Sequence, residues 1–117
     1  MIAYPNCKIN LGLHILEKRA DGYHTLETIF YPIPLTDILE IIENKDPINS
    51  PRFPLTTSGL PIQGSLSSNL CVKAYKLLKK DFPRMPWVRV HIHKVIPIGA
   101  GLGGGSSNGA FALHMYN

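Results

Sequence analysis

Residues 97–113 read PIGAGLGGGSSNGAFAL, and they constrain the architecture more tightly than any other part of the chain. Five glycines within seven positions leave the backbone free to adopt positive φ and to approach a ligand closely. Successive N–H groups in such a loop can point into one concavity and bind an anion. Ser106 and Ser107 add hydroxyl donors where a helix should begin, and a helix N-terminus carries roughly half a positive charge. The loop therefore predicts a polyphosphate site.

Three other interpretations of this loop are weaker. A Walker A loop requires a lysine before the serine, but Gly105 stands before Ser106. The dinucleotide fingerprint G-x-G-x-x-G fits Gly99, Gly101 and Gly104, but it is a weak signal alone and usually closes the first strand of its sheet. A flexible linker is disfavoured because an apolar alternating strand precedes the loop and an apolar helix follows it.

The segments near the loop have periodic patterns. Residues 87–93 alternate and predict a strand whose buried side chains are Val88, Val90 and Ile92. Residues 106–115 predict a helix that offers Ala110 and Leu113 to a core. Residues 70–82 predict a second helix, preceded by capping residues. Its expected buried face, at helical spacing, consists of Leu70, Ala74, Leu77 and Leu78.

The N-terminal half reads as strands and loops. Residues 8–16 alternate, with an apolar side that includes Ile9 and Leu11 and a polar side that carries Lys8 and Asn10. Asp21-Gly22 signals a turn, and further strands are expected at residues 26–31, 38–43 and 55–57. Prolines 32 and 34 are expected to lie in a link between strands. The pattern predicts an α+β domain, with a mixed or antiparallel sheet packed by two helices.

Composition narrows the function classes. The chain has 117 residues, enough for one domain, with 44% apolar and 17% charged residues, as is usual for a globular protein. The net charge of +4 suits an anionic ligand, but the basic residues are scattered, which argues against nucleic acid as a partner. No apolar run predicts a membrane span, and no secretory signal is expected. Two distant cysteines, Cys7 and Cys71, favour reduced thiols and a cytoplasmic location.

Residues 97–107 resemble the second signature of the GHMP kinases, the family named after galactokinase, homoserine kinase, mevalonate kinase and phosphomevalonate kinase. The opening segment KINLGLHILEKRADGYHTLETIF, residues 8–30, is similar to that of members acting on a cytidyl sugar alcohol. Those members phosphorylate the 2-hydroxyl of CDP-methylerythritol in non-mevalonate isoprenoid (terpenoid) biosynthesis. Residues 67–78, SSNLCVKAYKLL, resemble a helix of the same enzymes. The resemblance is weakest at residues 44–64.

The resemblance implies a ribosomal protein S5 domain 2-like fold, with ATP as phosphoryl donor and Mg²⁺ as its counter-ion. It implies that Lys8 is catalytic, beside the accepting hydroxyl, and that Asn10, Tyr23 and His24 hold the substrate. A lysine can neutralise charge in phosphoryl transfer, and a tyrosine ring can stack on cytosine. The residues implied to bind ATP are Asn69, Leu70, Lys94, Pro97, Ile98, Gly99, Ala100, Gly101, Leu102, Gly103, Gly104, Gly105, Ser106 and Ser107.

The family's catalytic aspartate is expected beyond residue 117, as are a third glycine-rich signature and a C-terminal domain. We therefore expect residues 1–117 to form an incomplete N-terminal domain that is inactive alone. Two departures from the family pattern are Cys7, where alanine is common, and Asn108, where many members have aspartate. Cys7 is predicted to be a small buried residue.

Two further functions stay open at this point: another GHMP small-molecule kinase with a different alcohol substrate, and a non-catalytic nucleotide- or RNA-binding module of the same fold. No metal site is predicted. His91 and His93 share one strand face, but no cysteine or carboxylate motif completes a ligand set. A homo-oligomer is compatible with the sequence.

Overall fold

The computed structural model describes residues 1–49 and 53–117. Its elements, in chain order, are β1 (Ile2–Ala3), β2 (Asn6–Lys18), β3 (His24–Thr36), β4 (Ile38–Glu43), β5 (Leu55–Gly59), the short 3₁₀ helix η1 (Leu66–Ser68), α1 (Leu70–Asp81), β6 (Val88–Lys94) and α2 (Gly104–Tyr116).

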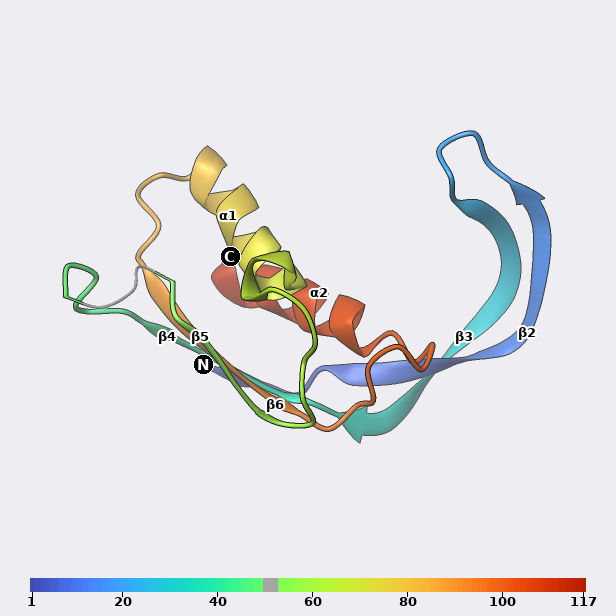
Figure 1. Cartoon of the computed structure of the whole chain (residues 1–117), viewed down its shortest axis with the longest axis horizontal. Helices are drawn as coiled ribbons and strands as arrows, with labels where there is room; N and C mark the ends of the chain where they lie inside the picture. The colour runs from blue at the N-terminus through green and yellow to red at the C-terminus, as the bar shows by residue number, and fades with distance from the viewer. Residues whose placement is uncertain (50–52) are drawn as a thin grey trace.

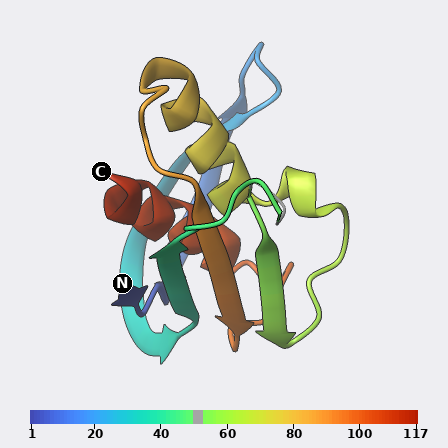
Figure 2. The ribbon, with the colours of Figure 1, turned by 90° about the vertical axis from the view of Figure 1, so that its left-hand side faces the viewer.

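One sheet contains β1, β4, β6 and β5, in that order. β5 runs parallel to β6, and the other neighbouring strands are antiparallel, so the sheet is mixed. Figures 1 and 2 show α1 and α2 together on one side of this sheet. The predicted α+β class, with a mixed sheet packed by two helices, is confirmed.

A separate two-stranded sheet is formed by β2 and β3, which extend away from the helices and curve outward (Figure 1). The prediction of a half-buried strand at residues 8–16 holds only near its start. Leu11, Leu13 and Ile15 are 48%, 53% and 64% exposed. The predicted alternation is also interrupted, because the register shifts between Leu11 and Leu13, where Gly12 has φ of 70°. Within the described residues no second layer covers this arm.

β3 is longer than the sequence suggested. Pro32 and Pro34, expected to lie in a link, are inside the strand, and Pro32 is the register partner of Lys8. Proline cannot donate a ladder hydrogen bond and is tolerated where a strand has a free edge. β3 has such an edge because its sheet contains only two strands.

The hydrophobic core lies between the four-stranded sheet and the two helices. Val88, Val90 and Ile92 point into it, as predicted. The sheet residues Leu39 and Ile41 join them. Burial of each such side chain contributes about 1.5–3 kcal/mol, which stabilises the layer that carries the loops.

The predicted buried face of α1 was wrong. Leu70 and Leu77 are 41% and 60% exposed, and the buried residues are Cys71, Val72 and Tyr75. The ring of Tyr75 stacks on Phe53 with centroids 4.5 Å apart, and its hydroxyl donates to the carbonyl of Pro86 at 2.9 Å. A buried tyrosine whose hydroxyl is bonded fills more of the core than the competing leucine stripe would.

The predicted core residues of α2 were also wrong, because Ala110 and Leu113 are exposed. The buried residues are Gly104, Asn108, Gly109 and Ala112. A Cβ on Gly109 would lie 2.8 Å from Cβ of Leu70, so α2 approaches α1 through a face of small residues. None of the helices in the described part of the chain is long and apolar enough to cross a membrane.

Candidate functional site

Two segments leave the same edge of the four-stranded sheet side by side. β5 and β6 are parallel and Gly59 pairs with Lys94, so the chain after each strand starts at the same edge. The amide of Leu60 donates to the carbonyl of Lys94 at 2.8 Å. A Cβ on Gly59 would lie 2.3 Å from that carbonyl oxygen, so only glycine permits this approach.

The segment after β6 is the glycine loop. Gly99, Gly101 and Gly103 have φ of 74°, 75° and 71°, a region that favours glycine. α2 begins at Gly104, two residues earlier than predicted, so Ser106 lies within its first turn. The amide of Ser107 donates to the carbonyl of Gly103 at 2.9 Å, and the first-turn amides before it have no intrahelical acceptor. Those amides and the helix dipole can bind an anion.

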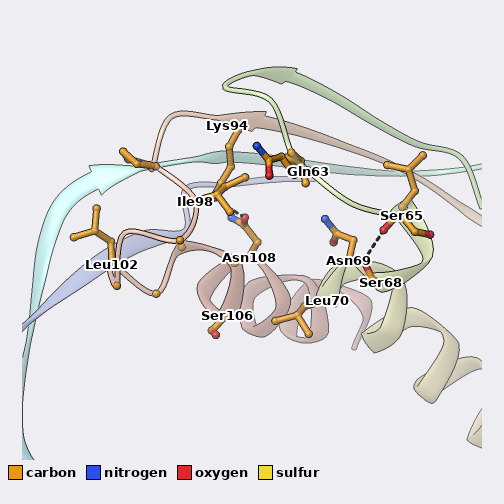
Figure 3. Close-up of a pocket in the computed structure, with 18 residues that line it drawn as sticks. Gln63, Ser65, Ser68, Asn69, Leu70, Lys94, Ile98, Leu102, Ser106 and Asn108 are labelled. Carbon is orange, nitrogen blue, oxygen red and sulfur yellow. Dashed lines mark hydrogen bonds between the residues drawn. The ribbon is translucent and has the colours of Figure 1, made fainter.

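The two segments and the start of α2 enclose a cavity of about 410 Å³, shown in Figure 3. This volume lies in the usual range of small-molecule sites, roughly 300–1,000 Å³. The implied ATP-binding residues that line it are Asn69, Leu70, Lys94, Pro97, Ile98, Gly99, Gly101, Leu102, Gly103, Gly104, Gly105 and Ser106. Ala100 and Ser107 are not among the lining residues.

Sequence reasoning missed one wall of this cavity. The additional lining residues are Ile62, Gln63, Ser65, Leu66, Ser68 and Asn108. All but Asn108 come from the stretch between β5 and α1, and the part of it before residue 67 has no periodic pattern or motif. Its position beside the glycine loop follows from the parallel pairing of β5 with β6, which the sequence does not show.

Lys8 of β2 contacts the glycine loop directly. Its amide donates to the carbonyl of Leu102 at 3.0 Å, and its ammonium donates to the carbonyl of Gly101 at 3.0 Å and to Oδ1 of Asn10. The ammonium also lies 5.1 Å from the ring centroid of Phe30. The structure therefore brings Lys8 and Asn10 together with the glycine loop.

Asn10 is held on its other side as well. Its Nδ2 donates to the hydroxyl of Thr28 at 3.0 Å, and that hydroxyl donates to the carbonyl of Gly12. The Asn10 amide is therefore fixed in orientation across the hairpin, with its oxygen toward Lys8.

Tyr23 and His24 lie elsewhere, at the tip of the β2–β3 hairpin. His24 pairs with Lys18, ten positions along β2 from Lys8. Tyr23 is 74% exposed, and its amide donates to Oδ1 of Asp21 at 3.0 Å within the turn. The structure does not bring these two residues to the glycine loop.

A buried ionic network lies beneath the loop, and the sequence did not reveal it. Nζ of Lys94 is 2.5 Å from Oδ2 of Asp37 and 3.3 Å from Oδ1 of Asn108. Nδ2 of Asn108 donates to the same Asp37 oxygen at 2.9 Å. Oδ1 of Asp37 accepts from the amides of Val95 and Ile96 at 2.7 and 2.8 Å. Lys94, implied to bind ATP, lines the cavity, and its ammonium is engaged by two protein side chains.

The charge state of Asp37 follows from these contacts. Burial alone would raise the pKa of its carboxyl. The hydrogen bonds from Lys94, the amides of Ile96 and Val95, and Asn108 outweigh burial and hold the pKa below its usual 3.8. Asp37 is therefore a carboxylate at neutral pH, paired with the lysine ammonium.

The cysteines and surface histidines form no second reaction centre. Cys7 and Cys71 are both free and buried, and Cys7 is the small buried residue that was predicted. Burial raises the pKa of the Cys71 thiol to about 12, so it stays protonated. His91 and His93 each contact the hydroxyl of Ser58 at 2.9 Å. Across residues 1–49 and 53–117, no three His, Cys, Asp or Glu side chains gather as metal ligands do.

Comparison with known proteins shows similarity to one family of kinases. Residues 69–117, which include α1, β6, the glycine loop and α2, match the model of the GHMP kinases N terminal domain. The chain is thus homologous to the GHMP kinases, as the resemblance of its glycine loop implied.

Its relatives include enzymes named 4-diphosphocytidyl-2-C-methyl-D-erythritol kinase. It is 56% identical over 117 residues to 4-diphosphocytidyl-2-C-methyl-D-erythritol kinase of Cytophaga hutchinsonii, and equally to the enzyme of Bacteroides fragilis. It spans 41% and 42% of the length of these two relatives. A crystal structure of 4-(cytidine 5'-diphospho)-2C-methyl-D-erythritol kinase superimposes with a TM-score of 0.73 at 37% identity, covering 98% of this chain and 39% of that one.

Proposed function

We propose that this chain forms the ATP-binding part of a kinase that phosphorylates the 2-hydroxyl of 4-diphosphocytidyl-2-C-methyl-D-erythritol, in isoprenoid biosynthesis. The observation that carries this proposal is the direct contact between Lys8 and the glycine loop, which lines one cavity together with the start of α2 and its free amides. The names of the relatives support the choice of substrate.

In this proposal the glycine loop and the first turn of α2 bind the ATP phosphates. Phosphoryl transfer depends mainly on positioning and on neutralising charge. The Lys8 ammonium, which contacts the neutral carbonyl of Gly101, exchanges that acceptor for a phosphate oxygen, because charge-assisted hydrogen bonds are the stronger ones. Lys8 then lies between the transferred phosphoryl group and the accepting hydroxyl.

Substrate contacts are assigned by the same proposal. Asn10 is fixed by Thr28 beside Lys8 and binds the sugar-alcohol part of the substrate. Tyr23 and His24 bind the cytosine. Because both lie at the tip of the hairpin, either the substrate extends along the hairpin or the hairpin tip bends toward the glycine loop. The adenine of ATP occupies the wall formed by Asn69, Leu70 and Ile98.

Mg²⁺ is proposed as the counter-ion of ATP. It binds oxygen ligands, keeps several waters and is commonly held through the phosphates themselves. The cavity lining, as far as the chain is described, offers the hydroxyls of Ser65, Ser68 and Ser106 and no carboxylate. Ser106 with the ATP phosphates suits Mg²⁺, which would supply neutralisation of phosphate charge.

The general base is proposed to lie outside residues 1–117, since the relatives are more than twice as long as this chain. We accordingly treat residues 1–117 as one N-terminal GHMP kinase domain. We also propose a cytoplasmic location, which two buried free thiols support.

The first test is nucleotide binding. Calorimetric titration of the chain with a non-hydrolysable ATP analogue should give saturable binding that Gly103→Ala weakens at least about tenfold, because the loop must lose its φ of 71° and a Cβ there would lie 3.2 Å from Cε of Lys8. The matched control is Gly22→Ala at the hairpin tip, another glycine of positive φ, which should change affinity less than twofold.

Equal effects of the two substitutions would contradict the assignment of the phosphate site. A phosphorylation assay with CDP-methylerythritol should give no turnover by residues 1–117 alone. Turnover would show that the base lies within them. Tighter competition by a different alcohol would favour another GHMP kinase, and binding of RNA as tight as that of ATP would favour a non-catalytic module.

A further inference from the structure

The buried network of Asp37, Lys94 and Asn108 joins three segments that meet only beneath the glycine loop. Asp37 lies between β3 and β4, Lys94 ends β6, and Asn108 is one turn inside α2. None of them belongs to the hydrophobic core cluster. Asp37 is fully buried and Lys94 is 3% exposed, so their charges are withdrawn from water at this one place.

One oxygen of Asp37 determines where the loop begins. Oδ1 accepts from two consecutive amides, those of Val95 and Ile96, at 2.7 and 2.8 Å. These residues connect β6 to Pro97, the first residue of the loop. A bend of two successive amides around one carboxylate oxygen fixes the direction in which the loop leaves the sheet.

The other oxygen determines where α2 begins. Oδ2 binds both Nζ of Lys94 and Nδ2 of Asn108. Nζ of Lys94 in turn lies 2.9 Å from the position a Cβ on Gly104 would occupy. The first residue of α2 therefore rests directly on the lysine ammonium, and Asn108 connects the second turn to the same carboxylate.

A purely stabilising role would not require this arrangement. Replacing a buried ion pair by apolar side chains of similar volume is often neutral or stabilising, because the desolvation cost of two charges offsets their attraction. The network instead orients the glycine loop. The residues before the loop bind Oδ1 of Asp37, and Asn108, in the helix after it, binds Oδ2.

We propose that Asp37 is a positioning residue, whose carboxylate holds both ends of the glycine loop in the arrangement that binds nucleotide phosphates. This inference rests on the proposed function for the identity of the ligand. The geometry of the loop that it describes can be measured without the ligand.

The decisive substitution is Asp37→Asn, which keeps shape but has one oxygen in place of two. If the amide oxygen faces Val95 and Ile96, the NH₂ group faces the donors of Lys94 and Asn108; if the amide is flipped, the NH₂ group faces the two backbone amides. In either orientation, the NH₂ group of the asparagine faces other hydrogen-bond donors.

The measurements are the affinity for an ATP analogue, per folded molecule, and hydrogen exchange of amides 99–106 in the unliganded chain. Asp37→Asn should weaken binding at least about tenfold and speed exchange in that segment more than in β6. Asp81→Asn, which removes an exposed acid at the end of α1, is the matched control and should leave both unchanged. A lowered melting temperature with unchanged affinity and unchanged loop exchange would show that Asp37 stabilises the fold but does not position the loop.

A second variant separates stability from position if Asp37→Asn fails to fold. The double change Asp37→Leu with Lys94→Met fills the site with apolar side chains and should restore folding while leaving nucleotide binding weak and loop exchange fast. Binding like that of the original chain would overturn the inference. If the unsubstituted chain binds no ATP analogue, the proposed function fails, whereas loop exchange still decides whether Asp37 positions the loop.

Discussion

Consecutive glycines in the loop are needed for different reasons. Gly103 has positive φ, whereas Gly104 is helical and is needed for space, because its Cβ would lie 2.8 Å from Cγ2 of Ile96. A Cβ on Gly105 would meet nothing within 4 Å. A side chain is therefore disfavoured at Gly103 by the backbone conformation and at Gly104 by contact, whereas Gly105 has room for one.

This difference predicts opposite effects on stability. Gly104→Ala should lower the free energy of unfolding by about 1–3 kcal/mol, because Ile96 and Lys94 must move. Gly105→Ala should raise it by about 0.4–1 kcal/mol, because it restricts the unfolded chain without strain. Urea unfolding followed by circular dichroism measures both, and equal effects would contradict the packing described beneath α2.

Asp37 predicts how stability depends on pH. Its native pKa lies below the unfolded value of about 3.9, so the unfolded chain binds its proton first as pH falls. The stabilisation is complete above that unfolded pKa and is lost as pH falls from about 5 through the native pKa. The midpoint of urea unfolding should therefore drop steeply below pH 5, and less steeply in Asp37→Asn. Parallel pH profiles for the two chains would argue against a paired carboxylate.

At the scale of elements, strands and helices could be predicted because alternation and helical spacing are local properties. The buried faces of α1 and α2 could not, because they depend on how closely the helices approach. Gly109 permits that approach at Leu70, and glycine carries no signal in a hydrophobic pattern. The glycine loop was likewise visible in consecutive residues, whereas the contacts of Asp37 form only when three distant segments meet.

The contact between the helices gives a prediction of its own. Gly109→Ala should lower the free energy of unfolding by about 1–3 kcal/mol, because a Cβ there would lie 2.8 Å from Cβ of Leu70. The double variant Gly109→Ala with Leu70→Ala should lose less free energy of unfolding than the sum of the two single losses. The shortened side chain at position 70 keeps only its Cβ and can shift away from position 109. Strict additivity, measured by a double-mutant cycle, would show that the two residues do not touch.

For the whole molecule, the hairpin and the body differ in how they are stabilised. The four-stranded sheet has helices on one face and a shared core, whereas β2 and β3 beyond Leu11 have only each other. Two-stranded sheets are marginal in water. The apolar side chains along this arm are about half exposed, so they contribute less burial energy than those of the core.

Hydrogen exchange should reveal this division. Amides at positions 13–18 and 24–28 should exchange by local opening, far faster than those at 39–42 and 89–93. Gly22→Pro, a change confined to the turn, should speed exchange in the arm and leave the sheet protected. Uniform protection across arm and sheet would mean that the chain opens as one unit.

The hydrogen bonds from Lys8 to the carbonyls of Gly101 and Leu102 join positions more than ninety residues apart. During translation, β2 is synthesised about 5–20 s before Gly101 and Leu102, the residues whose carbonyls Lys8 contacts, at ordinary translation rates. A nascent chain that stops short of residue 101 carries the lysine but no glycine loop for it to contact. The contact on which the proposed phosphate site depends therefore forms only after residues 101 and 102 have been synthesised.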